Sequence, residues 1–290
     1  MPLGHKYVGM VKAVGSGVQR FHMGDRVTGS FATACGRCWE CQQQYYSQCR
    51  QRQLFGFGSR FGNLAGTQAE WARIPNADAT LIPVPPDVED ADALLVGDIL
   101  STAYFAVERS EMRPGDTVAV VGLGPVGLLM VHLAYLFGVA RVLALDTVEP
   151  RLIAAARAGA ELVRADDAAV REVRERTGGR GADVVLEAVG REDSLRLACQ
   201  LVRGFGTVSL SGAFSDVASG VPMDRIFMKD LTIRTGIANV RKVAPQVMAL
   251  LAYHRLDVEL FSHRLPLKQG FQGYELFARR EAMKVLLTPE

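Results

Sequence analysis

Four of the five cysteines lie in one short stretch, CGRCWECQQQYYSQC, as Cys35, Cys38, Cys41 and Cys49. Thiolates at such short spacings can converge on one ion, and four sulfurs complete the tetrahedron of Zn²⁺ with no position open to a substrate. The stretch therefore predicts a structural zinc site. Two disulfides, four free thiols and a nucleic-acid-binding zinc ribbon are the alternatives, and the spacing together with the expected intracellular location favours zinc. The fifth, Cys199, is expected to be a small buried side chain.

A second stretch with possible chemistry is VAVVGLGPVG, which places Gly122, Gly124 and Gly127 in a G-x-G-x-x-G pattern between a predicted strand and a predicted helix. Such a turn lets a pyrophosphate approach the backbone at the helix N-terminus. The next predicted strand ends in Asp146, where a carboxylate can accept hydrogen bonds from both ribose hydroxyls and would repel a 2′-phosphate. The pattern predicts dinucleotide binding, with NAD favoured over NADP.

The third candidate is His5 in MPLGHKYVGM, which is followed directly by Lys6. A histidine so near the start of the chain is either the beginning of a strand or part of a metal site whose other ligands lie elsewhere. These residues alone leave both readings open.

The elements that position these residues change character along the chain. Residues 1 to about 98 hold short β-like runs, whereas residues 99–237 alternate apolar strands with helical segments. That order predicts an α/β fold with a parallel sheet and helices on both faces. The remaining residues predict one amphipathic helix followed by strand, helix and strand, which we expect to return to the first domain.

Bulk composition excludes several classes of protein. The 290 residues are 49% hydrophobic and 22% charged, with a net charge of +2, which gives no general attraction to nucleic acid or acidic membranes. No apolar run reaches the length of a membrane span. With no export signal recognisable, we expect a cytoplasmic protein without nucleic-acid or membrane partners.

The cysteine stretch, the glycine turn, and the motifs GDRV and GHxxxG together resemble the zinc-dependent medium-chain alcohol dehydrogenases. The resemblance runs from residue 3 to the C-terminus. It implies a Rossmann domain, a doubly wound parallel sheet, inserted in a GroES-like β-rich catalytic domain. The implied bounds are 1–98 for the GroES-like part with its zinc lobe at 35–49, 99–237 for the Rossmann domain, and 238–290 for the return.

The resemblance also implies a catalytic zinc, and it assigns two of that zinc's ligands to His5 and Asp98. An aspartate at the second position is similar to the glutathione-independent formaldehyde dehydrogenases. Thr102 is assigned to the nicotinamide and Arg151 to the adenosine ribose. The family's first zinc-ligand cysteine has no counterpart here, so we expect an N-terminally truncated chain, through a misplaced start or as a natural remnant. Lys6 replaces a glutamate behind the zinc, and its charge should weaken zinc binding unless it points into solvent.

The resemblance implies a zinc-dependent oxidoreductase that transfers hydride between an alcohol or aldehyde and NAD. The alternative is a non-catalytic NAD-binding protein that keeps only the structural zinc. A zinc-free quinone reductase is a third reading, which the cysteine stretch disfavours. The segment VPMDRIFMKDLTIRTG resembles the one through which the family pairs its sheets, so we expect a homodimer or homotetramer.

Overall fold

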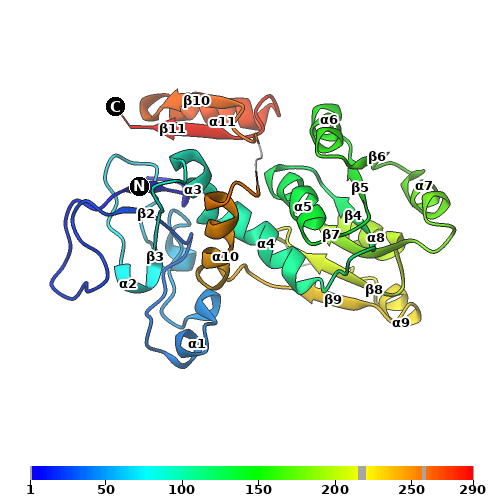
Figure 1. The fold of residues 1–290 in the computed structure, drawn as a ribbon, viewed down its shortest axis with the longest axis horizontal. Helices are drawn as coiled ribbons and strands as arrows, with labels where there is room; N and C mark the ends of the chain where they lie inside the picture. The colour runs from blue at the N-terminus through cyan, green and yellow to red at the C-terminus, as the bar shows by residue number, and fades with distance from the viewer. Residues whose placement is uncertain (1, 215–219, 257–258, 290) are drawn as a thin grey trace. The chain divides into compact units, whose positions relative to one another are not determined.

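The computed structural model describes residues 2–214, 220–256 and 259–289. The chain forms two compact units (Figure 1). Unit 1 comprises Met1–Ser101 with Asn239–Glu290, and unit 2 comprises Thr102–Ala238. The middle of the chain thus folds as a body of its own, and the two flanking stretches fold together.

Unit 2 contains a six-stranded sheet with the order β6-β5-β4-β7-β8-β9, in which every pairing is parallel. Its strands are β4 (Thr117–Val121), β5 (Arg141–Asp146), β6 (Glu161–Arg164), β7 (Ala182–Glu187), β8 (Val202–Leu210) and β9 (Thr232–Thr235). All residues of β4 are buried, as expected for a central strand covered on both faces. The predicted α/β fold class with a parallel sheet is confirmed.

Helices cover both faces of this sheet (Figure 1). They are α5 (Pro125–Leu136), α6 (Glu149–Arg157), α7 (Ala169–Arg176), α8 (Glu192–Leu201) and α9 (Met223–Met228), with α4 (Ile99–Arg109) entering from unit 1. The chain adds strands on one side of β4 and then on the other. Right-handed crossovers therefore place α5 with α6 on one face and α7 with α8 on the other.

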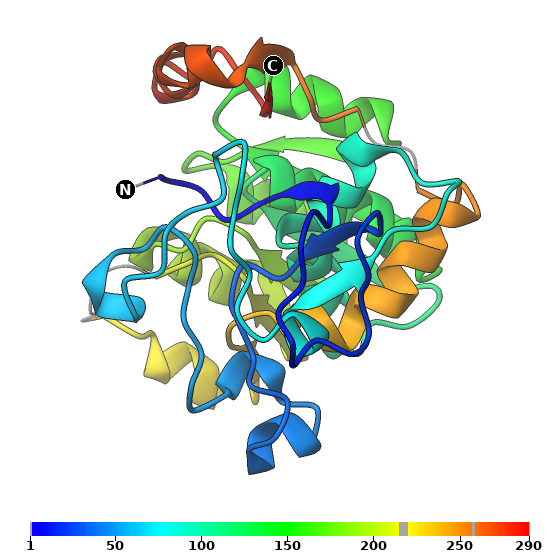
Figure 2. The same cartoon turned by 90° about the vertical axis from the view of Figure 1, so that its left-hand side faces the viewer.

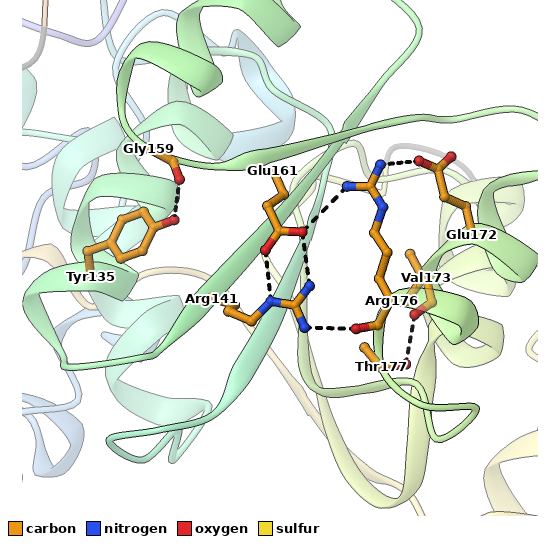
Figure 3. Close-up of polar contacts among 8 residues, drawn as sticks. All are labelled: Tyr135, Arg141, Gly159, Glu161, Glu172, Val173, Arg176 and Thr177. Carbon is orange, nitrogen blue, oxygen red and sulfur yellow. Dashed lines mark hydrogen bonds and ion pairs between the residues drawn. The ribbon is translucent and has the colours of Figure 1, made fainter.

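The β5, β6 and α7 elements are joined by a network of charged side chains, drawn in Figure 3. The Arg141 guanidinium donates to both oxygens of Glu161, from Nε at 2.7 Å and from Nη2 at 2.9 Å. Arg176 lies 3.6 Å from the same carboxylate and also pairs with Glu172. In the arginine-rich helix α7, Arg171 and Arg174 are exposed, whereas Arg176 is half-buried and belongs to this network.

Unit 1 contains a three-stranded antiparallel sheet, β1-β2-β3, and a separate parallel pair, β10 and β11. In Figure 2 the blue and cyan strands of the first sheet lie side by side. The strands are β1 (Val8–Met10), β2 (Arg26–Gly29), β3 (Leu81–Pro83), β10 (His263–Pro266) and β11 (Val285–Thr288). The helical elements are α1 (Trp39–Gln42), η1 (Tyr46–Gln48), η2 (Ser59–Phe61), α2 (Ala77–Thr80), α3 (Asp90–Val96), α10 (Val240–Ala252), η3 (Leu267–Gln269) and α11 (Gly270–Ala278).

Of the β-like runs expected within residues 1 to about 98, the one at 7–18 contains only the short strand β1, and residues 16–17 form a turn. Behind the sheet, Phe21, Val27 and Leu81 form a small buried cluster. Across the part of the chain that the structure describes, no helix has the length and apolar character needed to cross a bilayer.

Candidate functional site

The four clustered cysteines come together in unit 1 on the loop around α1 and η1. Their sulfur atoms all lie within 4.8 Å of one another. The Sγ atoms of Cys35 and Cys41 are 4.0 Å apart, and those of Cys38 and Cys49 are 3.9 Å apart. Tetrahedral Zn²⁺ with Zn–S bonds of about 2.3 Å separates its sulfurs by roughly 3.8 Å. The donor set and its spacing therefore fit a closed zinc site.

Backbone N–H groups support negative charge on these sulfurs. The Cys35 N–H donates to Cys49 Sγ at 3.3 Å, and the Cys38 N–H donates to Cys35 Sγ at 3.3 Å. Burial alone would raise the pKa of Cys35, but N–H donors from Arg37 and Cys38 lower that pKa to about 6. Burial raises the pKa of Cys41 to about 12, and no disulfide joins any of the cysteines. A bound dication would hold all four as thiolates.

In unit 2 the glycine turn lies between β4 and α5, beside the turn that follows β7. Gly122 adopts φ +88°, and a Cβ there would lie 2.4 Å from Val189 Cγ2. A Cβ on Gly127 would lie 1.8 Å from the Gly122 carbonyl oxygen, whereas one on Gly124 would meet nothing within 4 Å. The first and third glycines thus allow close packing, and the second leaves the backbone open at the start of α5. Strand order reverses between β4 and β7, which is where ligands bind in such sheets.

Asp146 ends β5 and is 7% exposed. Its Oδ2 accepts from the Leu123 N–H at 2.7 Å, so the carboxylate ties the end of β5 to the glycine turn. Its Oδ1 accepts from the N–H groups of Thr147 and Val148 at 2.7 and 2.9 Å. Arg151 Nη1 lies 3.6 Å from Oδ2, too far for a strong hydrogen bond. A ribose hydroxyl donating to Oδ2 would share this oxygen with the Leu123 N–H and with the long Arg151 contact.

Two further residues complete the picture of unit 2. Thr102, predicted to lie near the nicotinamide, is half-buried in α4 at the first position of the unit. Glu187 ends β7 fully buried, and its Oε1 accepts from the N–H groups of Val189 and Gly190 at 2.8 Å each. An acidic residue at the end of the apolar run ADVVLE was the signal available in the sequence. Glu187 shapes the turn that faces Gly122.

His5 and Asp98, which are far apart in sequence, meet within unit 1. Residues 2–4 pair with residues 66–68 through backbone hydrogen bonds, and this fixes the start of the chain. The His5 ring stacks at a tilt on Phe57, with centroids 5.2 Å apart. Asp98 follows α3, whose end approaches β2 closely: a Cβ on Gly97 would lie 2.3 Å from the Gly29 carbonyl oxygen. The two side chains thereby come within 3.0 Å, Nε2 to Oδ2.

Lys6 joins this pair instead of pointing into solvent. Its Nζ lies 2.6 Å from Asp98 Oδ2 and 2.9 Å from His5 Nε2. Burial alone would raise the pKa of Asp98, but the polar contact with His5 and the charge of Lys6 hold that pKa well below its usual range. Of the two expected outcomes for Lys6, weaker zinc binding or a side chain in solvent, the second does not hold, because the Asp98 carboxylate offers Lys6 a partner inside unit 1. We refer to His5, Lys6 and Asp98 as the triad.

The triad does not fit a three-ligand zinc site. Within residues 2–214, 220–256 and 259–289, the four cysteines are the only group of three or more His, Cys, Asp or Glu residues placed to hold a metal ion. A catalytic zinc takes three protein ligands, and His5 with Asp98 supplies two. Their assignment as zinc ligands stays a prediction, against which the position of Lys6 stands.

Comparison with known protein families gives two matches, which together cover most of the chain. Residues 1–86 match the model described as the alcohol dehydrogenase GroES-like domain. Residues 125–253 match the model described as zinc-binding dehydrogenase. The first match covers the cysteines and His5, and the second begins directly after the glycine Gly124.

Individual relatives agree with these matches. The chain is 36% identical to zinc-type alcohol dehydrogenase B of Aspergillus flavus, over 98% of this chain and 68% of the relative. It is 34% identical to a zinc-type alcohol dehydrogenase-like protein of Bacillus subtilis, over 99% and 85%. Among solved structures, an alcohol dehydrogenase from Thermus sp. ATN1 is similar with a TM-score of 0.94 and 45% identity, over 99% of this chain and 84% of that one. A second, called an NAD-dependent alcohol dehydrogenase, has a TM-score of 0.85 and 29% identity, over 99% and 82%.

Proposed function

Because this chain belongs to the zinc-dependent medium-chain alcohol dehydrogenase family, we propose that it transfers hydride between a small alcohol or aldehyde and NAD. The family relationship makes the chain an oxidoreductase. The observation that carries the choice of cofactor is the glycine turn, with Gly124 open at the start of α5 and the Asp146 carboxylate beside it. NAD supplies the acceptor or donor of hydride in this chemistry.

The residues of unit 2 support NAD in distinct ways. Backbone N–H groups at the start of α5 favour the pyrophosphate, which Gly124 admits without a side chain in the way. The Asp146 carboxylate would bind ribose hydroxyls and repel a 2′-phosphate. One of the similar solved structures is called an NAD-dependent alcohol dehydrogenase, which also favours NAD as the cofactor. Thr102 and Arg151 are proposed to contact the nicotinamide and the ribose, as the family resemblance implies.

The four cysteines are proposed to hold a structural zinc, which when bound clamps the loop around α1. The substrate oxygen is proposed to lie near His5 and Asp98, the residues that the resemblance assigns to the catalytic site. The oxygen is negatively charged once the alcohol has lost its hydroxyl proton and before hydride leaves, and again after hydride has reached an aldehyde; a fixed positive group nearby stabilises that charge. Lys6 places such a charge at this position.

We also propose a homodimer or a homotetramer in the cytoplasm. The helix α9, which precedes the edge strand β9, carries exposed apolar side chains, with Phe227 at 81% and Met228 at 80% exposure. The free edge of β9 can pair with a second copy, and these side chains would be covered in such a contact. The cysteines, none in a disulfide, suit a reducing compartment. Light scattering of Phe227→Asp would reveal a smaller assembly than the wild type if this edge is the interface.

A second candidate function is binding of NAD without turnover. The contact of Lys6 with both His5 and Asp98 favours it, because that contact departs from the zinc site on which the family relies. In this case the chain would bind NAD through unit 2 and convert no alcohol.

Steady-state reduction of NAD by short primary and secondary alcohols distinguishes hydride transfer from NAD binding without turnover. With Asp146→Asn, which keeps the shape of the side chain, we expect the KM for NAD to rise about tenfold while kcat changes little, since one hydrogen bond to a charged group is worth about 1.5 kcal/mol or more. Preference for NAD over NADP should fall in the same variant. NAD binding in calorimetry with no turnover of any alcohol would overturn the proposal and support the second candidate.

A further inference from the structure

The three polar atoms of the triad form a closed triangle. Lys6 Nζ lies 2.6 Å from Asp98 Oδ2 and 2.9 Å from His5 Nε2, and these two atoms are 3.0 Å apart. The side chains are only partly exposed, 21% for Lys6 and 18% for Asp98. At these distances and with this burial, the three side chains contact one another directly within the folded unit.

The chemistry of the three groups determines which of them donate hydrogen bonds and which accept them. An ammonium only donates hydrogen bonds and a carboxylate only accepts them. With the ring proton of His5 on Nδ1, Nε2 accepts from the ammonium at 2.9 Å through its lone pair. His5 Nε2 and Asp98 Oδ2 therefore converge on one cationic centre, as two ligand atoms converge on a metal ion.

Zinc and the Lys6 ammonium compete for the same position. Zn²⁺ bonds to histidine nitrogen and carboxylate oxygen at about 2.0–2.1 Å, so an ion bonded to both atoms on the Lys6 side would lie roughly 1 Å from Nζ. The two cations exclude each other sterically. Like charges also repel strongly at such a distance.

We propose that Lys6 is the resident cation of the His5–Asp98 pair and excludes a second zinc from this chain. The four cysteines then hold the chain's zinc, and the triad is a metal-free polar centre whose positive charge comes from the protein. This inference concerns metal content alone and does not depend on the proposed turnover.

The test is the zinc content of the full-length protein, measured by elemental analysis after passage over a chelating resin. We expect one zinc per wild-type chain. Lys6→Glu removes the competing cation and adds a carboxylate, so we expect two, and Asp98→Asn in that background should return the content to one. The matched control is Lys12→Glu, because Lys12 is an exposed lysine of unit 1 and its reversal should leave one zinc.

Cobalt substitution gives a second readout. Cobalt in the cysteine cluster shows thiolate charge-transfer bands, whereas a nitrogen–oxygen site adds d–d absorption without them, and we expect the added signal only in Lys6→Glu. Two zincs in the wild type, with one lost in Asp98→Asn, would overturn the proposal even if the Lys6 variant did not fold. A folded Lys6→Glu protein that keeps one zinc would overturn it as well.

Discussion

Replacing Asp98 with asparagine keeps the size of the side chain and removes the charge that holds Lys6 and His5. Exposed ion pairs contribute at most about 1 kcal/mol, whereas removing one partner of a buried pair costs about 3–5 kcal/mol. The 18% exposure of Asp98 and 21% of Lys6 place the triad between these limits. We therefore expect unit 1 to lose about 2 kcal/mol, which lowers its melting temperature by roughly 6 °C.

Tryptophan fluorescence is the assay suited to this prediction. The chain has two tryptophans, and both Trp39 and Trp71 belong to unit 1, so their emission reports that unit alone. The matched control is Asp90→Asn, because Asp90 is 68% exposed in its pair with Arg26 and should cost no more than about 0.5 kcal/mol.

The effect should also depend on pH. The folded state lowers the pKa of Asp98, so its contribution is fully present above the unfolded pKa of about 4 and is lost as the pH falls below it. The difference between wild type and Asp98→Asn should therefore be full at neutral pH and shrink in acid. An Asp98→Asn protein as stable as Asp90→Asn at neutral pH would refute the account of the triad.

Four further substitutions test other parts of the structure. Cys41→Ser should release the zinc and lower the thermal stability of unit 1, because three thiolates no longer close the tetrahedron; elemental analysis and tryptophan fluorescence check this. Gly127→Ala should destabilise unit 2 by about 3 kcal/mol, since its Cβ would lie 1.8 Å from a carbonyl oxygen, whereas Gly124→Ala should keep stability and weaken NAD binding in calorimetry. Glu161→Gln should cost unit 2 about 1 kcal/mol in urea unfolding, because it leaves two arginines of Figure 3 without their shared partner.

Each of these has a contrary outcome. A Cys41→Ser protein with unchanged zinc would mean that the metal is bound elsewhere. Equal loss of NAD affinity in the Gly127 and Gly124 variants, with stability unchanged in both, would contradict the different packing of the two glycines. A Glu161→Gln protein with wild-type stability would show that the network contributes nothing to folding.

The central part of the fold was predictable because its strands are apolar along their length. The runs that became β4, β5, β7 and β8 were all predicted as strands. The two edge strands, β6 and β9, were not predicted as strands. β9 has an exposed or half-exposed side chain at every position, and an edge strand that buries so little carries no apolar pattern.

The candidate sites divide in the same way. The cysteines and glycines could be found because their spacing is local and their chemistry depends on that spacing. The contact between Lys6 and Asp98 could not be predicted. Asp98 lies just after α3, and only the packing of α3 on β2 brings its carboxylate to Lys6. Such a contact depends on tertiary structure, whereas the sequence shows only that the two side chains have opposite charges.

The central claim, hydride transfer between NAD and an alcohol or aldehyde, is tested most directly by following the hydride itself. Wild-type protein would be incubated with NADH deuterated at C4 of the nicotinamide and a panel of short aldehydes, and the alcohols analysed by mass spectrometry. The account predicts deuterium on the carbinol carbon of at least one alcohol, from one face of the nicotinamide only. Bound deuterated NADH with no labelled alcohol from any aldehyde would contradict the claim and leave a protein that binds the cofactor without turnover.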